Sequence, residues 1–357
     1  MTDEATVTPY SARDAIRAVI DGEYLSEIQA SDVMDGIMKG KVTPSQIAAL
    51  ITALRIRGET VEELTGFARA LRGHVQKVVV PDDRPLIDTC GTGGDGSGTF
   101  NISTTAAIVI AGTGVRVAKH GNRSVTSRSG SADVLEALGV VIDLPPEAVA
   151  TSIRDAGIGF MFAPSYHPGF RHAGPTRREI GVRTVFNYLG PMTNPAGLRR
   201  QIIGVSAPEA AWMMAEALGR LGSERVLIVY SPEGLDELGL GGDSHVVEFD
   251  VERGEPIDYT IGPQSFGLKS ASVQELAGGD AVHNAEVTRR ILQGEEGARR
   301  DVVLFNAGAG LYAAGVAENV AQGVEMARDT IDSGRAAEAL ERFIAVTQAL
   351  VDRGAPA

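Results

Sequence analysis

Residues 86–131 carry the groups most suited to chemistry in this 357-residue chain. The stretch includes a loop with five glycines, namely Gly91, Gly93, Gly94, Gly96 and Gly98. We interpret residues 85–87 as the end of a strand, and the apolar run at 106–110 as a buried helix. A strand, a glycine loop and a helix start in that order form an anion site. Glycines let the backbone approach a phosphate, and the helix N-terminus offers free N–H groups.

The local charge supports an anionic ligand. The chain has a net charge of −13, yet residues 96–132 contain no Asp or Glu. The same window holds Arg116, Lys119, His120, Arg123 and Arg128. An acid-free, locally basic segment in an acidic protein predicts a polyanionic small molecule. The alternative is a glycine-rich loop that only turns tightly between two packed elements.

Two common phosphate loops fit poorly. Gly91 to Gly96 matches G-x-G-x-x-G, but a dinucleotide fold also needs an acidic residue about 20 positions on, and residues 111–121 have none. A Walker loop needs Gly-Lys-Ser/Thr, which does not occur here. Instead a second polar turn follows at residues 119–123. Two polar loops around one helix indicate a ligand larger than a single phosphate.

The elements that must position these loops fall into two groups. Residues 11–76 predict consecutive helices at about 12–20, 31–38 and 45–57, with a fourth from Thr60, because apolar residues recur at three- and four-residue spacing. Ser11 is the expected cap of the first. Residues 78–85 read as a linker. No chemistry is visible in this part, whose simplest use is packing or self-association.

From residue 86 onward, β-branched runs alternate with helical stretches. We expect strands at 115–118, 140–142, 159–162, 202–205 and 226–230. Helices are expected at 131–138, capped by Ser131, at 146–156 and at 208–221. Such alternation predicts an α/β fold with a central, mostly parallel sheet flanked by helices. Ligands then bind at the carboxyl ends of its strands.

Composition narrows the class of protein. Apolar residues make up 43% and charged residues 22%, as in a globular protein. The acidic, polar N-terminus argues against a signal peptide, and no apolar run is long enough to span a bilayer. The single cysteine, Cys90, fits a cytoplasmic location and is expected to be a small buried residue. The negative charge argues against nucleic acid as a partner.

Three long motifs resemble one enzyme family. GTGGDGSGTFNIST (91–104), KHGNRSVTSRSGSADVLEALG (119–139) and RREIGVRTVFNYLGPMTNPAG (177–197) are similar to anthranilate phosphoribosyltransferases of tryptophan biosynthesis. The likeness extends from about residue 25 to the end. It implies an N-terminal helical domain over residues 1–80, joined by part of 175–200, that forms a homodimer. Residues 81–357 would form the catalytic α/β domain.

The resemblance also implies site residues. Contacts to 5-phosphoribosyl-1-diphosphate (PRPP) are expected from Gly91, Thr92, Gly93, Gly94, Asp95, Thr99, Asn101, Ser103, Thr104, Lys119, Asn122, Ser127, Gly130 and Ser131. Contacts to anthranilate are expected from Gly91, His120, Asn122, Tyr166, His167, Arg177, Gly190 and Pro191. Arg177 suits this role because a guanidinium pairs bidentately with a carboxylate.

Magnesium follows from the same resemblance. Adjacent acids after a buried strand are usually solvated surface, but Asp236 and Glu237 match the family's metal-binding pair, and Ser103 matches a hydroxyl ligand. Mg²⁺ prefers carboxylate and phosphate oxygens, and two ions per subunit are expected. One departure lies beyond: relatives commonly carry Ser or Thr where this chain has Gly-Leu-Gly-Gly at 239–242.

The implied reaction transfers the 5-phosphoribosyl group from PRPP to the amino nitrogen of anthranilate, with release of diphosphate. We assign no catalytic side chain, although His120 or His167 could orient the substrate or accept the proton late. Three alternatives stay open at this point: a pyrimidine nucleoside phosphorylase, a non-catalytic nucleic-acid binder, and a transferase acting on another aromatic acid. His167 and His172 are not spaced like zinc ligands.

Overall fold

The first four helices begin where the sequence supplies a cap. In the computed structural model they are α1 (Ala12–Ile20), α2 (Glu27–Met38), α3 (Pro44–Arg57) and α4 (Val61–His74). Ser11, Ser26, Thr43 and Thr60 each accept a hydrogen bond from a backbone N–H in the first turn. The four predicted helices are therefore confirmed. The second starts four residues before the predicted Ser31, because Ser26 and Gln29 form a reciprocal capping box.

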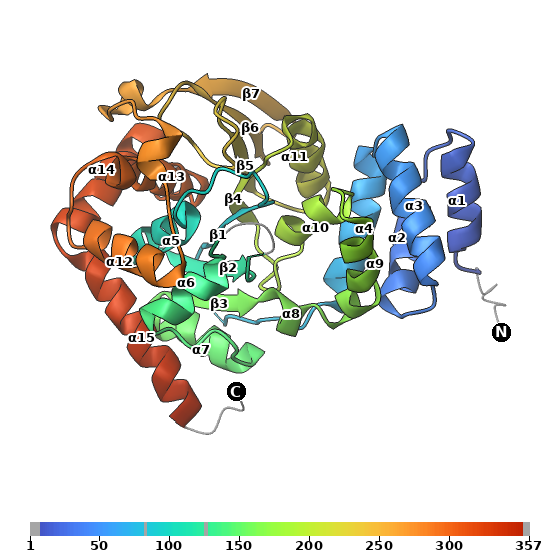
Figure 1. Ribbon diagram of the computed structural model, residues 1–357, viewed down its shortest axis with the longest axis horizontal. Helices are drawn as coiled ribbons and strands as arrows, with labels where there is room; N and C mark the ends of the chain where they lie inside the picture. The colour runs from blue at the N-terminus through green and yellow to red at the C-terminus, as the bar shows by residue number, and fades with distance from the viewer. Residues whose placement is uncertain (1–7, 82–83, 125–127, 353–357) are drawn as a thin grey trace. The chain divides into compact units, whose positions relative to one another are not determined.

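The structure describes residues 8–81, 84–124 and 128–352, and these form two units (Figure 1). Unit 1 comprises the described residues up to Val75 together with His167–Thr193; unit 2 comprises Gln76–Tyr166 and the chain from Asn194 onward. Unit 1 is thus built from two separate stretches of sequence.

The second stretch of unit 1 contributes η1 (Pro168–His172), α9 (Gly174–Ile180) and α10 (Phe186–Met192). These pack against α2, α3 and α4 respectively. A side chain at Gly169 would clash with Met38, since a Cβ there would lie 2.8 Å from its sulfur. The Arg72 guanidinium donates to the Met192 carbonyl oxygen at 2.9 Å. A small residue, Gly169, and a backbone acceptor at Met192 therefore allow residues 167–193 to pack against α2 and α4.

Unit 2 is organised on a seven-stranded sheet of order β3-β2-β1-β4-β5-β6-β7. The strands are β1 (Leu86–Gly91), β2 (Arg116–Gly121), β3 (Ile158–Phe162), β4 (Arg200–Gly204), β5 (Arg225–Tyr230), β6 (Ser244–Asp250) and β7 (Pro256–Ile261). The first five pair in parallel, whereas β5–β6 and β6–β7 are antiparallel. The predicted α/β class with a mostly parallel sheet is confirmed.

Helices cover this sheet. They are α5 (Ile102–Gly112), α6 (Ser131–Leu138), α7 (Pro146–Ala156), α8 (Ala163–Tyr166), α11 (Ala211–Arg220), α12 (Ala281–Leu292), α13 (Ala298–Ala313), α14 (Val320–Asp332) and α15 (Arg335–Asp352), with single turns η2 (Pro208–Ala210), η3 (Pro263–Phe266) and η4 (Val273–Leu276). Alternate residues of β2 and β3 face opposite cores: Val117 and Ile158 join the core that contains α5, while Ala118 and Met161 pack with α7. The apolar α5 is buried almost throughout.

Three local predictions were wrong. Residues 85–87 do not end a strand; β1 begins at Leu86 and runs on to Gly91. Residues 140–142 form no strand, because their apolar side chains are covered by helices and the Val141 N–H donates to the Thr347 hydroxyl of α15. Ser131 is not the cap of α6. Gly130 occupies that position, and the Asp133 carboxylate accepts from its N–H at 2.8 Å.

Within the described residues, no helix combines the length and apolar character needed to cross a membrane.

Candidate active site

The candidate site lies at the carboxyl ends of the parallel strands of unit 2. β1 ends at Gly91 and is followed by the glycine loop, which leads into α5. β2 ends at Gly121 before the second polar loop, and β5 ends at Tyr230 before the loop that carries Asp236 and Glu237. Because parallel strands deliver their carboxyl ends to one edge of a sheet, three loops far apart in sequence meet there.

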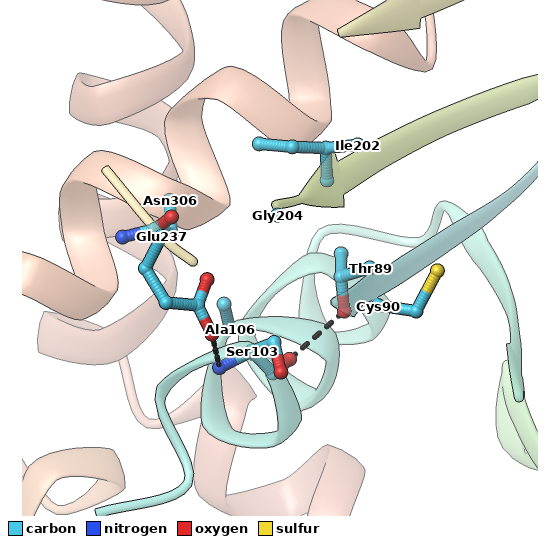
Figure 2. A pocket seen from close by; sticks show the side chains of 8 residues that line it. All are labelled: Thr89, Cys90, Ser103, Ala106, Ile202, Gly204, Glu237 and Asn306. Atoms are coloured by element: carbon cyan, nitrogen blue, oxygen red, sulfur yellow. Dashed lines mark hydrogen bonds between the residues drawn. The ribbon is translucent and has the colours of Figure 1, made fainter. Parts of the chain in front are cut away.

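The glycine loop and the acid loop (residues 231–243) are hydrogen-bonded to each other. The Gly93 N–H donates to Asp236 Oδ2 at 2.7 Å, and the Ser103 N–H donates to Glu237 Oε1 at 3.2 Å. The second contact is drawn in Figure 2. Ser103 lies in the first turn of α5, where backbone donors lack helical partners. Backbone N–H groups predicted to hold an anion thus bind carboxylates of the chain itself.

Two glycines make this approach possible. A Cβ at Gly91 would lie 2.5 Å from Asp236 Oδ2, and a Cβ at Gly204 would lie 1.5 Å from the Asp236 carbonyl oxygen. The second contact is with backbone and leaves no room for any side chain. Gly93 and Gly94 adopt φ values of 68° and 70°, which side chains disfavour. Glycine is therefore required both for the turn and for seating the acid loop on the strand ends.

The paired acids are electrostatically unsatisfied. Burial, and next the nearby Asp95 carboxylate, raise the pKa of Asp236 to about 6. Burial, and next the charge of Asp236, raise the pKa of Glu237 to about 8, while Lys119 opposes that rise. Among the described residues neither acid forms a salt bridge with a Lys or Arg. Such a pair gains most from a divalent cation.

Lys119 lies inside the protein. Its side chain is buried, and its ammonium donates to the Thr89 carbonyl oxygen. The charge of Lys119 also lowers the pKa of Asp88, although burial has the larger, opposite effect. Lys119 therefore balances buried carboxyl groups in this structure, and its contact with PRPP stays a prediction.

The second polar loop is held by its own backbone. The Ser131 hydroxyl donates to the Asn122 carbonyl oxygen at 3.3 Å. A Cβ at Gly130 would lie 2.4 Å from the Ser124 nitrogen, so glycine is needed where the loop meets α6. Arg123 is paired with Asp133 and Glu136 on the surface. The predicted Ser127 lies outside the described residues.

The remaining predicted PRPP residues are placed around the glycine loop. Asn101 ties three segments: its amide donates to the Ser129 carbonyl oxygen at 3.1 Å and its oxygen accepts from Asn284 at 3.0 Å. The hydroxyls of Thr92 and Thr99 pair with Ser206 and Ser97. Thr104 is buried, and Asp95 accepts from the Ser97 N–H.

The predicted anthranilate residues divide between the two units. In unit 1, the Arg177 guanidinium lies 5.0 Å from the ring centre of Phe186 and 5.8 Å from that of Phe170. It has no ion-pair partner among the described residues, and burial lowers its pKa. His167 is buried, which lowers its pKa to about 4 and keeps the imidazole neutral at pH 7. Gly190 and Pro191 belong to α10.

In unit 2, the His120 side chain is mostly buried, and the backbone N–H of His120 donates to the Asp88 carboxylate. Tyr166 is 1% exposed, and its hydroxyl donates to the Leu144 carbonyl oxygen at 2.7 Å. This placement favours a packing role for Tyr166, and its proposed contact with anthranilate remains a prediction.

Known proteins resemble this chain over nearly its whole length. The glycosyl transferase family α/β domain matches residues 83–337, and the helical bundle domain of that family matches residues 13–75. The anthranilate phosphoribosyltransferase of Rubrobacter xylanophilus is 51% identical over 344 residues, covering 96% of this chain and 99% of the relative. That of Chloroflexus aggregans is 53% identical, covering 94% and 98%.

Solved structures agree. The anthranilate phosphoribosyltransferase of Thermus thermophilus has a TM-score of 0.88 at 48% identity, covering 94% of this chain and 99% of that one. The chain belongs to the anthranilate phosphoribosyltransferase family. The Saccharomyces cerevisiae enzyme in complex with PRPP and Mg has a TM-score of 0.85 at 27% identity, covering 95% and 98%. The same yeast enzyme has been solved with 4-fluoroanthranilate, with a TM-score of 0.83 at 26% identity, covering 96% and 100%.

Residues 239–242, the Gly-Leu-Gly-Gly segment that departs from the pattern implied by the resemblance, are closely packed here. A Cβ at Gly241 would lie 2.1 Å from Glu233 Oε1, and one at Gly239 would lie 2.8 Å from the Ser231 Cβ. Leu240 is buried. The Glu233 side chain thus takes the space that side chains at these glycines would need, and this part of the acid loop offers no hydroxyl.

The acid pair fits a magnesium ion bound together with a diphosphate. Among the described residues, no three His, Cys, Asp or Glu side chains are grouped to hold a metal by themselves. Mg²⁺ usually takes one or two carboxylates and completes its shell with water and substrate phosphate. Two adjacent carboxylates without a salt bridge, next to a phosphate-type loop, match that requirement.

Sequence reasoning missed Asp88. This β1 carboxyl is fully buried, and it accepts from Asn194 at 2.9 Å as well as from the His120 N–H. Burial raises the pKa of Asp88. An acid in the middle of an apolar strand was the available signal. Asp88 thus joins β1 to the second and third of the motifs that carry the family resemblance. Burial likewise raises the pKa of the neighbouring Cys90 thiol, in keeping with an inert buried cysteine.

Proposed function

We propose that this chain transfers the 5-phosphoribosyl group of PRPP to the amino nitrogen of anthranilate, in the second step of tryptophan biosynthesis from chorismate. The observation that carries the proposal is the junction of the glycine loop with the acid pair: Gly93 and Ser103 donate to Asp236 and Glu237. Family membership at 51% identity supports the same reaction.

The chemistry accounts for this junction. Breaking the C1–O bond of PRPP leaves positive charge on the sugar and added negative charge on diphosphate. The site must therefore present donors and cations to the leaving group in a fixed geometry. The N–H groups of the glycine loop and of the first turn of α5 can move from the carboxylates to phosphate oxygens once a cation neutralises Asp236 and Glu237. Magnesium would supply that charge.

We propose that Arg177 binds the carboxylate of the acceptor, anthranilate. A guanidinium lying against Phe170 and Phe186, with no anion beside it among the described residues, is prepared for a planar aromatic carboxylate. The amine of anthranilate is uncharged at pH 7 and needs no strong base. The neutral His167 fits an orienting role or late acceptance of the proton. Correct positioning of two substrates contributes up to about 7–11 kcal/mol in favourable cases.

We further propose two magnesium ions per subunit, with Ser103, Asp236 and Glu237 as protein ligands. The 4-fluoroanthranilate and PRPP–Mg complexes of the yeast enzyme support the classes of ligand. Isothermal titration of Mg²⁺ into the protein with PRPP would give the number of ions. A stoichiometry of one would reject the second site.

A cytoplasmic homodimer formed through unit 1 completes the proposal. Several apolar side chains of its helices are exposed, among them Ile20 at 67%, Ile28 at 75% and Ile56 at 81%. These side chains belong to three helices of unit 1, α1, α2 and α3, and we propose that a second copy of the chain covers them. Light scattering coupled to gel filtration tests the assembly, and a monomer at micromolar concentration would contradict it.

The decisive assay mixes purified protein with PRPP, Mg²⁺ and anthranilate and follows the loss of anthranilate fluorescence. We expect loss that requires all three components. The main rival, pyrimidine nucleoside phosphorolysis, predicts turnover of thymidine with phosphate and without added magnesium. That result, with no consumption of anthranilate, would replace the proposal.

A further inference from the structure

Three buried leucines anchor the acid loop in the hydrophobic core. Leu235, Leu238 and Leu240 are each at most 1% exposed, while Asp236 and Glu237 lie between them and face the glycine loop. The Ser231 hydroxyl accepts from the Leu235 N–H, and the Ser244 hydroxyl accepts from the Gly239 N–H. These two hydrogen bonds hold Leu235 and Gly239. The backbone N–H and carbonyl oxygen of Leu238, directly after Glu237, are paired with a side chain outside the loop.

That contact comes from Asn306 in the middle of α13. Asn306 Oδ1 accepts from the Leu238 N–H at 3.0 Å, and Asn306 Nδ2 donates to the Leu238 carbonyl oxygen at 2.9 Å. The same amide donates to the Val302 carbonyl oxygen at 2.9 Å. One side-chain amide thus pairs both backbone groups of one residue, as a neighbouring strand would.

The two hydrogen bonds between Asn306 and Leu238 lie next to Glu237, the acid that we propose as a metal ligand. Asn306 is 3% exposed and lines a small cavity together with Glu237, Ser103 and Thr89, as Figure 2 shows. A residue held at both its N–H and its carbonyl has little freedom about its backbone dihedrals. The direction in which the preceding Glu237 side chain leaves the chain is therefore set by α13 as well as by the strand ends.

We propose that Asn306 is a positioning residue for the acid pair: its bidentate contact with Leu238 aims Glu237 for metal binding. This rests on the proposed function of the site and adds a residue outside the three resemblance motifs. Asparagine is suited to the position because its amide carries both a donor and an acceptor at every pH. Aspartate keeps the shape but, when ionised, directs negative charge at the Leu238 and Val302 carbonyl oxygens.

The test compares Asn306→Asp and Asn306→Ser with Val303→Ala. Val303 is a fully buried residue on the same helix, and its apolar side chain cannot form a hydrogen bond with the backbone of the acid loop. Binding of Mn²⁺ in the presence of PRPP is measured by electron paramagnetic resonance, and turnover is measured over a range of Mg²⁺. For both Asn306 variants we expect metal affinity to fall about 10–100-fold, while the KM for anthranilate stays within about twofold.

The Val303→Ala control should lose thermal stability and keep wild-type Mn²⁺ affinity. Folded Asn306 variants with wild-type Mn²⁺ affinity, or a matching loss in Val303→Ala, would overturn the proposal; if the Asp variant does not fold, the milder Ser variant decides. Failure of the proposed function looks different, because wild-type protein would then bind Mn²⁺ with PRPP and still leave anthranilate unconsumed.

Discussion

Arg177 in unit 1 and the acid pair in unit 2 are both charged groups withdrawn from water, and they respond to that in different ways. Burial lowers the pKa of Arg177, but a guanidinium remains protonated at any physiological pH, and two aromatic rings face its charge. Burial raises the pKa of Asp236 to about 6 and that of Glu237 to about 8, so these groups can take up protons near neutrality.

The two regions therefore differ in whether their charge depends on pH. Arg177 is permanently charged, and in the role that we propose for it, its guanidinium pairs with the carboxylate of the acceptor, which is an anion of fixed charge. In the role that we propose for the acids, Asp236 and Glu237 exchange a proton for a metal ion, so their affinity for the ion would depend on pH. A carboxylate pair can be assembled without a cation at modest cost, because protonation relieves the repulsion. Pairing the Arg with an acid of the protein would have removed its value for a substrate.

Removing the acid pair should have the largest effect. The double variant Asp236→Asn, Glu237→Gln keeps size and hydrogen-bonding capacity but deletes the charge that a metal requires. We expect kcat to fall about 10²–10³-fold, since metal charge stabilisation is worth several kcal/mol, with a raised Mg²⁺ requirement. The measurement is kcat against Mg²⁺ concentration. Unchanged activity at low magnesium would reject the metal role.

Removing the permanent cation should affect only the acceptor. For Arg177→Ala we expect the KM for anthranilate to rise about 10–100-fold, as charge-assisted hydrogen bonds are worth about 1.5–3 kcal/mol. The KM for PRPP should be nearly unchanged. Arg177→Lys should recover part of the loss, because an ammonium lacks the planar fork. Equal increases for both substrates would remove Arg177 from the acceptor pocket.

The pH response should distinguish the two regions directly. Both acids have a folded-state pKa above the unfolded value, so the stability that protonation gives the metal-free protein is present in acid and is lost as the pH rises towards 8. The melting temperature without Mg²⁺ should therefore fall between about pH 5 and pH 8.5, less steeply in Glu237→Gln. Apparent Mg²⁺ affinity should rise over the same range.

The KM for anthranilate, by contrast, should stay flat between pH 6 and 8.5, since neither Arg177 nor the buried His167, with its pKa of about 4, titrates there.

A melting temperature that rises with pH in the metal-free protein would show that the acids are not held in the protonated, desolvated state described.

The smallest effect is expected from a cation that is already paired. Arg123 lies in the basic segment of the sequence, yet its guanidinium is within 2.9 Å of Asp133 and 2.5 Å of Glu136 on the surface. Exposed pairs contribute about 0–1 kcal/mol. Arg123→Ala should change the KM for PRPP by less than about threefold, in steady-state kinetics at physiological salt. A tenfold change would mean that Arg123 contributes to PRPP binding even though its guanidinium is paired with two acids.

The sequence was a good guide wherever a local signal and the long-range contact agreed. Apolar residues at three- and four-residue spacing predicted the first four helices, although the start of the second was four residues off. The alternation of β-branched and helical runs predicted a mostly parallel sheet. The run at 140–142 has the composition of a strand, but a strand needs a partner edge, and its N–H at Val141 found Thr347 instead. Partners more than 200 residues away in the chain leave no local signal.

The site shows the same limit. The residue types of the glycine loop and of the acid pair were readable, yet their mutual hydrogen bonds depend on which strand ends adjoin. Lys119 shows why charge alone is insufficient: a lysine in a basic, polar segment reads as a ligand contact, whereas its ammonium is turned inward to the Thr89 carbonyl oxygen. Asp88 and Asn306 act through backbone groups of distant residues, which no motif specifies.

The split composition of unit 1 has a consequence for synthesis on the ribosome. Helices α1 to α4 are translated first, but η1, α9 and α10, which pack against α2, α3 and α4, follow about ninety residues later. Until then Met38 and the Arg72 side chain lack the Gly169 and Met192 contacts that cover them in the finished protein. The N-terminal bundle therefore exposes this surface until residue 192 has been synthesised, and a fragment ending near residue 80 would expose it permanently.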